Sequence, residues 1–207
     1  FQDLTGQTNC SRCSAGSVSG SPASTECTAC PAGRFVKSYK FSLQDGIEMA
    51  LDDTTLQTAC TDCAKGKVQA NAGSTECGVC SPGRYANFSG MKNCIDCPVN
   101  YYNDETSQFE SSRWWCEACP AGSSTKGYTK SEKCSLCSYG KFSKSAKDCV
   151  DCRIGKVAPD LGSVYCKACS SGSYTPDTVG AIECKLCENL GEARTSLRGS
   201  HSINGCK

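Results

Sequence analysis

Ten cysteine pairs of the form CxxC recur along the chain, and their spacing limits the fold more than any other feature of the sequence. The pairs begin at Cys10, Cys27, Cys60, Cys77, Cys94, Cys116, Cys134, Cys149, Cys166 and Cys184, and Cys206 follows alone. Successive pairs start 15 to 18 residues apart, except across two longer inserts. A fixed period of this kind is typical of repeat proteins, in which each unit packs mainly against its neighbours.

The composition indicates that cross-links replace a hydrophobic core. The chain has 21 cysteines in 207 residues, a content typical of disulfide scaffolds. Leu, Ile, Val and Phe together make up only 29 residues, which is below the roughly 20% under which an uncrosslinked chain tends to stay disordered. The predicted fold class is therefore a small disulfide-rich protein of short two-stranded β ribbons. We expect an elongated, rod-like tandem array with little regular secondary structure and no central core.

Two further positions repeat with the cysteines. The third residue after each CxxC pair is glycine in eight of ten repeats and Asn100 in another, which predicts a left-handed backbone there. Two residues later, eight of ten repeats carry a β-branched or aromatic residue, such as Val18 or Tyr85. This alternation is typical of a short, half-buried strand. Each unit is thus predicted to form a tight turn and a small ribbon.

The one-pair period favours a ladder of disulfides. A crossed scheme, joining first to first and second to second cysteines of neighbouring pairs, would repeat every two pairs. In the ladder, the second cysteine of each pair bonds the first cysteine of the next. The predicted bonds are Cys13–Cys27, Cys30–Cys60, Cys63–Cys77, Cys80–Cys94, Cys97–Cys116, Cys119–Cys134, Cys137–Cys149, Cys152–Cys166, Cys169–Cys184 and Cys187–Cys206. Cys10 is left unpaired within the segment, and we expect its partner to lie upstream of Phe1.

The same ladder predicts the division of the chain into repeats. Residues 1–12 form the tail of an upstream repeat, and the segment is expected to start and stop inside a longer array whose targeting signal lies elsewhere. The predicted repeats are 13–29, 30–62 with a long insert, 63–79, 80–96, 97–118 with an aromatic insert, 119–136, 137–151, 152–168, 169–186 and a truncated 187–207.

The repeat unit resembles a known extracellular module. Its clearest copies are Cys27-Thr-Ala-Cys30-Pro-Ala-Gly33-Arg-Phe35 and Cys77-Gly-Val-Cys80-Ser-Pro-Gly83-Arg-Tyr85. They resemble the ephrin-receptor-like cysteine-rich repeat and, more loosely, tumour-necrosis-factor-receptor modules, which often add crossed disulfides. The resemblance covers nearly the whole chain. It implies an extracellular or cell-surface array, made in the secretory pathway, that serves as a receptor ectodomain, adhesive stalk or matrix element. It implies a scaffold and not a particular ligand.

Metal and catalytic sites are less favoured interpretations. Ten CxxC pairs could form five zinc sites, but the odd cysteine and the Gly-, Ser- and Thr-rich texture favour disulfides. A thioredoxin-like site needs a βαβ setting and one distinguished CxxC pair. The only histidine, His201, lies in a Gly-Ser loop. We therefore expect no enzyme activity, no metal and no cofactor. The net charge of +1 and the lack of a long apolar run predict no nucleic-acid partner and no membrane contact within the segment.

The inserts and the sequons are the candidate sites. The insert between Cys30 and Cys60 is predicted to form a short helix or a ribbon. The candidate contact residues of the second insert are Tyr101, Tyr102, Phe109, Trp114 and Trp115, because aromatic residues are enriched in interface hot spots. The competing interpretation is that these rings only cover a thin loop. Asn87 and Asn9 begin glycosylation sequons.

Two classes of function remain. The first is a non-catalytic extracellular spacer, stalk or fibre subunit of a larger surface or matrix protein. The alternative is a ligand-binding or adhesion ectodomain of a cell-surface receptor. Repeats dominate the chain and its charge is nearly balanced, which favours the structural role. The expected partners are proteins, including copies of the chain itself in a fibre, together with covalently attached glycans.

Overall fold

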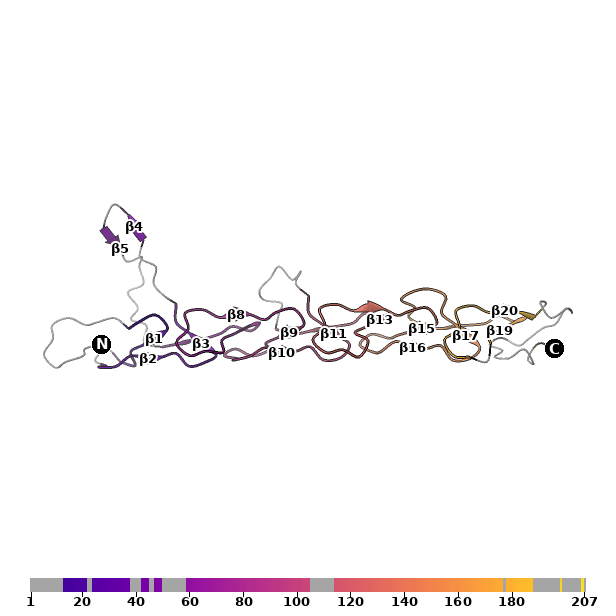
Figure 1. Cartoon of the computed structure of the whole chain (residues 1–207), viewed down its shortest axis with the longest axis horizontal. Coiled ribbons are helices and arrows are strands. Elements are labelled where there is room, and N and C mark those ends of the chain that lie inside the picture. Colours follow the sequence, from indigo (N-terminus) through magenta and orange to yellow (C-terminus); the bar gives the residue numbers. More distant parts are fainter. Residues whose placement is uncertain are drawn as a thin grey trace. The chain divides into compact units, whose positions relative to one another are not determined.

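The computed structural model of the chain describes residues 13–21, 24–37, 42–44, 47–49, 59–104, 114–176, 178–187, 198 and 206. The described residues form ten two-stranded sheets, and Figure 1 labels many of their strands between β1 and β20. Each strand is two or three residues long, and the described residues contain no α-helix. The part of the chain that the structure describes thus has no helix with the length and apolar character of a membrane span.

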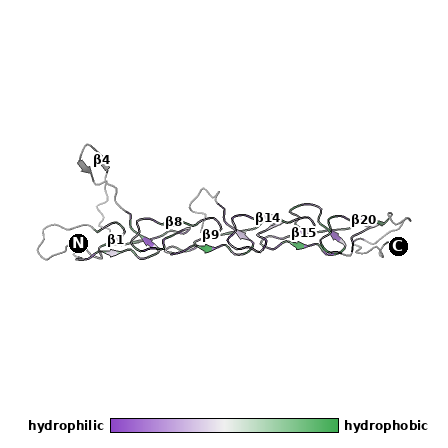
Figure 2. Ribbon diagram, viewed as in Figure 1, coloured by the Kyte–Doolittle hydropathy of each residue, from purple (hydrophilic) through white to green (hydrophobic). Residues whose placement is uncertain are grey.

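Nine of the ten sheets have one arrangement, which confirms the predicted ribbons. The first strand follows the tight turn after a CxxC pair, and its partner, which the sequence did not identify, is the two residues inside the next CxxC pair. Figure 2 shows hydrophobic and hydrophilic strands mixed along the chain. The paired strands are β1 (Ser17–Val18) with β2 (Thr28–Ala29), β3 (Arg34–Phe35) with β6 (Thr61–Asp62), β7 (Lys67–Val68) with β8 (Gly78–Val79), β9 (Arg84–Tyr85) with β10 (Ile95–Asp96), β11 (Tyr101–Tyr102) with β12 (Glu117–Ala118), β13 (Ser123–Ser124) with β14 (Ser135–Leu136), β15 (Lys141–Phe142) with β16 (Val150–Asp151), β17 (Lys156–Val157) with β18 (Lys167–Ala168), and β19 (Ser173–Tyr174) with β20 (Lys185–Leu186).

The tenth sheet lies in the insert between Cys30 and Cys60. It is an antiparallel hairpin of β4 (Ser42–Gln44) and β5 (Ile47–Met49), in which Leu43 pairs with Glu48. The insert therefore contains a ribbon, one of the two alternatives that its sequence allowed.

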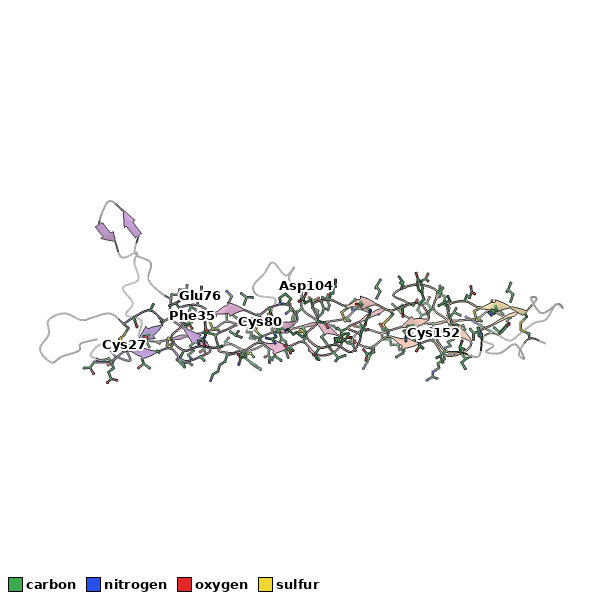
Figure 3. The ribbon with its side chains drawn as sticks, viewed as in Figure 1. Cys27, Phe35, Glu76, Cys80, Asp104 and Cys152 are labelled. Carbon is green, nitrogen blue, oxygen red and sulfur yellow. A yellow bond between two sulfur atoms is a disulfide. The ribbon has the colours of Figure 1, made fainter. Side chains whose placement is uncertain are left out.

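Ten disulfides close ten successive loops, which are numbered here loop 1 to loop 10 in chain order. Their pairs, from Cys13–Cys27 to Cys187–Cys206, are the same as those of the ladder proposed from the sequence period. The yellow bonds of Figure 3 show them recurring along the chain. The second cysteine of a CxxC pair is buried, as at Cys80 and Cys152, which are both 0% exposed. Cys10 lies outside the described residues.

The chain forms two compact units, each built from several consecutive loops. The first unit comprises residues 1–95 and 106–115, and the second comprises residues 96–105 and 116–207. Each predicted repeat boundary remains a prediction within these larger units.

Inside each unit, backbone hydrogen bonds join successive loops in a constant register. In the second unit, the Cys137 N–H donates to the Gly122 carbonyl at 2.8 Å, and the Gly122 N–H donates to the Ser143 carbonyl at 3.0 Å. The Gly162 N–H donates back to the Cys137 carbonyl at 2.8 Å. The first of these bonds recurs at the amide groups of Cys30, Cys63, Cys80, Cys119, Cys152, Cys169 and Cys187. Because loops bond mainly to their neighbours, each unit is a repeat structure in the physical sense.

Alternate loops approach so closely that glycine is required at the contact. Gly122 has a φ of +84°, and a Cβ placed on it would lie 2.0 Å from the carbonyl oxygen of Gly162, two loops ahead. The same contact is made by Gly140 with Gly180, Gly16 with Gly73, and Gly33 with Gly90. The positive φ predicted after each CxxC pair is thus confirmed at these positions. The sequence did not reveal the second requirement, the close approach of another loop; Leu190 lies outside the described residues.

Asn100 replaces glycine at this position and adds a side-chain bridge. Its φ of 65° is left-handed, as predicted. The Asn100 N–H donates to Thr125 Oγ1 at 2.9 Å, and the Thr125 N–H donates to Asn100 Oδ1 at 3.3 Å. Thr125 Oγ1 also donates to the Tyr128 carbonyl at 2.7 Å. Loop 7, which follows two loops later, is the shortest of the ten, with a sequence separation of 12 between its cysteines.

The interior of the array is small and polar. The sixth residue after each CxxC pair is buried in most loops, but these residues are mainly Ala, Ser, Thr and Asn. Thr175 is completely buried, and its Oγ1 accepts a hydrogen bond of 2.7 Å from the Gly155 N–H. Ser143 is also buried and donates to the Ser123 carbonyl at 3.0 Å. Because these hydroxyl groups have partners, their burial avoids the cost of an unsatisfied polar group.

The ribbons carry ion pairs on their exposed face. Arg34 Nε lies 2.6 Å from Asp62 Oδ1, and Lys141 Nζ lies 3.0 Å from Asp151 Oδ1, each pair joining the two strands of one ribbon. All four side chains are roughly half exposed, so each pair contributes at most about 1 kcal/mol. The ribbons therefore depend on the disulfides and backbone bonds more than on charge.

We predict that Gly122→Ala disrupts its loop more than Gly172→Ala. Both positions have φ above +80°, so each substitution adds left-handed strain of about 1 kcal/mol. Gly122 faces a carbonyl that its new Cβ would strike, whereas no atom of the described residues lies within 4 Å of that position at Gly172. Hydrogen exchange checks this at the amides of Cys137 and Cys187, which donate to Gly122 and Gly172 respectively. We expect Cys137 to lose more than tenfold of its protection and Cys187 less; equal losses would contradict the contact.

Candidate contact surfaces

The structure divides the predicted aromatic contact set between the two units. Tyr101 and Tyr102 form β11 in the second unit, whereas Trp114 and Trp115 belong to the first. Phe109 lies outside the described residues. The two pairs are therefore considered as separate surfaces.

The adjacent tryptophans form an aromatic stack in the first unit. Their rings stack with centroids 4.6 Å apart and an angle of 21° between planes. Lys65 Nζ lies 5.1 Å from the centroid of the Trp114 ring, which is within the range of a cation–π contact. Trp114 is half-buried beneath these contacts, while Trp115 is 52% exposed. The stack thus presents one large ring to solvent on a fixed base.

Tyr102 has a structural partner in its own ribbon. It pairs with Glu117 across β11 and β12, and its hydroxyl group donates to Glu117 Oε2 at 3.1 Å. Burial of the hydroxyl raises the pKa of Tyr102, and the hydrogen bond to Glu117 and the negative charges of Glu117 and Asp104 raise it further. The phenol therefore stays protonated at neutral pH and keeps donating this bond. The interpretation that these rings cover a thin loop describes Tyr102 better than it describes Trp115.

A hollow of about 430 Å³ lies between loops 6 and 7 in the second unit. Ser124 is a buried residue of its lining, at the position that is β-branched or aromatic in eight repeats, and loop 7 is the shortest loop. These two departures from the repeat leave the space unfilled. Leu136, which is 62% exposed, gives the hollow an apolar wall, and Lys126, Lys141 and Asp148 supply charge. The sequence did not predict this hollow, because the hollow forms only where loops 6 and 7 pack against each other.

Asn87 lies in a loop whose sequon is partly exposed. Phe88 is 66% exposed and Ser89 is exposed, while Asn87 itself is half-buried. Its Oδ1 is buried and accepts no hydrogen bond from the described residues. Asn9 and His201 lie outside the described residues.

Cysteine side chains in the described loops are held in disulfides. Within the described ranges, no three or more His, Cys, Asp or Glu side chains gather as metal ligands would.

The geometry defines a class of protein, the disulfide-linked tandem repeat. In this class, the buried second cysteine of each CxxC pair, the tight glycine turn and the ribbon of two-residue strands recur in a constant register. Residues 83–131 match the family model described as tyrosine-protein kinase ephrin type A/B receptor-like. This match covers part of the chain, and the regular series of ten disulfides supports ephrin-receptor-like cysteine-rich repeats, which are typically non-catalytic structural modules. The family and the ten disulfides together indicate an extracellular segment. No curated protein matches the chain.

Proposed function

We propose that the chain is a non-catalytic extracellular spacer, stalk or fibre subunit of a larger surface or matrix protein. One observation carries this proposal: two contacts between loops recur along the array. One is the hydrogen bond from the Cys137 N–H to the Gly122 carbonyl, and the other is the close packing of Gly122 against the Gly162 carbonyl. Backbone groups of each loop are thereby used to hold its neighbours. An array of this kind sets the separation of whatever it connects.

Electron microscopy of the native parent protein tests the fibre role. Under non-reducing conditions, negative staining should show ordered fibres with a regular axial repeat, because repeated faces favour repeated contacts between copies. Reductant should make the fibres fall apart, since each loop is closed by its disulfide. Isolated particles that never associate would contradict the fibre role and favour the receptor alternative.

The second candidate function is a ligand-binding or adhesion ectodomain. The exposed ring of Trp115 on its stacked base favours it, because large aromatic side chains dominate many protein interfaces. The hollow beside Leu136 offers a second possible contact for a protein partner. The structural role is the favoured one because the contacts that support it extend along the described loops.

Replacing Trp115 tests whether the tryptophan stack is a contact between copies. We predict that Trp115→Ala lowers self-association of the chain at least tenfold, measured by sedimentation velocity. Tyr128→Ala is the matched control, since Tyr128 is 71% exposed and lies in the other unit. Unchanged self-association in Trp115→Ala would show that the tryptophan stack only covers its own loop and is not a contact between copies.

We also propose that Asn87 carries an N-linked glycan. Its sequon lies in a partly exposed turn of a chain with many disulfides, which fits passage through the secretory pathway. Expressed in a secreting eukaryotic cell with Asn9→Gln in every chain, the protein should lose mass on treatment with an N-glycan amidase, and the further substitution Asn87→Gln should remove the glycan mass without treatment. Equal masses in the two chains, apart from the one methylene group that Gln adds, would refute glycosylation at this site.

A further inference from the structure

We propose that this array bears tension along its disulfides, acting as a tether whose taut length the sulfur ladder fixes. The inference deepens the proposed spacer function and rests on it. It comes from the covalent path through the bonds, which any pulling force on the two ends must follow.

That covalent path bypasses the residues between the two bonded cysteines of each loop. Each disulfide joins cysteines at a sequence separation of 12 to 30 across a Cα–Cα distance of only 5.5 to 5.8 Å. The next disulfide begins after the two residues inside the CxxC pair. A load therefore passes through a bond, crosses a two-residue linker, and enters the next bond. The polypeptide of each loop lies beside this path and carries none of the load.

The linkers are themselves held in the folded loops. Between Cys149 and Cys152, Val150 and Asp151 form β16, which pairs with β15 of the preceding loop. Asp151 adds the ion pair to Lys141, and Cys152 N–H donates to the Gly140 carbonyl at 2.8 Å. The other linkers of the described repeats form strands in the same way. The loaded path is thus anchored to its surroundings at every step.

This topology limits how far the oxidised chain can extend. From Cys13 to Cys206, ten disulfide crossings and nine linkers give a taut length of about 155 Å, at about 3.6 Å per extended residue. With every bond reduced, the same 193 residue steps reach about 690 Å. The ladder therefore makes an oxidised tether roughly four times less extensible than the reduced chain.

The tryptophan stack lies outside the loaded path, whereas Leu136 of the hollow lies in the linker between Cys134 and Cys137. Trp114 and Trp115 come before Cys116 within loop 5, which its disulfide bypasses. Tension on the ends does not pull directly on these two tryptophans. The tether can consequently present them to a partner while it is under load.

Single-molecule force spectroscopy on the full chain tests the proposal, with peptide tags at both ends and Cys10→Ser in every variant. In the oxidised chain, we expect the length between Cys13 and Cys206 to stop increasing at about 155 Å. A trialkylphosphine with water converts each disulfide into two thiols and becomes a phosphine oxide, and it should release stepwise length up to about 690 Å.

Paired cysteine variants make the test quantitative. Removing one bond should lengthen the taut chain by about 38 Å for Cys137→Ser with Cys149→Ser, and by about 45 Å for Cys63→Ser with Cys77→Ser. Cys30→Ser with Cys60→Ser should add about 100 Å. The high-force contour length is independent of whether a variant loop folds. Gains proportional to loop size support the load path.

Gains unrelated to loop size, or an oxidised chain that extends well beyond its expected limit, would overturn the tether. Such a result would leave open whether the parent protein forms fibres, which microscopy decides separately. Conversely, isolated particles in the microscope combined with the expected lengths would refute the fibre role and retain a tension-bearing ectodomain.

Discussion

The bond from the second cysteine of one CxxC pair to the first cysteine of the next is the constraint on which the structure depends. Each bond closes its own loop, and in the loop-closure model a loop of about 15 residues gains roughly 3 kcal/mol because the unfolded chain is restricted. The stabilisation is local and repeats along the chain. It allows loops with few aliphatic residues to fold, and it leaves their interior free to hold small polar side chains such as Thr125 and Thr175.

Close packing of alternate loops follows from that local closure. A short loop with a fixed end can bring its turn against the backbone of a loop two positions earlier, as Gly162 does at Gly122. Glycine is needed on the earlier loop because a carbonyl oxygen occupies the place of its Cβ. Where Asn100 replaces glycine, its side chain instead bridges to Thr125. The disulfides thus give stability, and the glycine contacts give the loops their register.

The sequence predicted the elements that depend on period and local chemistry. The ribbons and the positive φ at Gly122 and Asn100 follow from residues that recur at fixed distances from cysteine. The contacts between loops could not be predicted, because the sequence does not indicate which loops pack against each other. The hollow at Ser124 and the polar interior around Thr175 depend on those packing contacts between loops. The aromatic set was only partly predictable, since Tyr102 is bonded to Glu117 in its own ribbon, while Trp115 stacks on Trp114 and stays 52% exposed.

Partial reduction of the secreted protein, followed by alkylation of the freed thiols and mass spectrometry, tests the ladder most directly. Opening one bond should free cysteines on two neighbouring CxxC pairs, the second of the earlier and the first of the later, such as Cys137 with Cys149. A crossed scheme would instead free Cys134 with Cys149, or Cys137 with Cys152. Recovery of those crossed pairs would contradict the ladder, and with it the load path and the loop closure on which the fold rests.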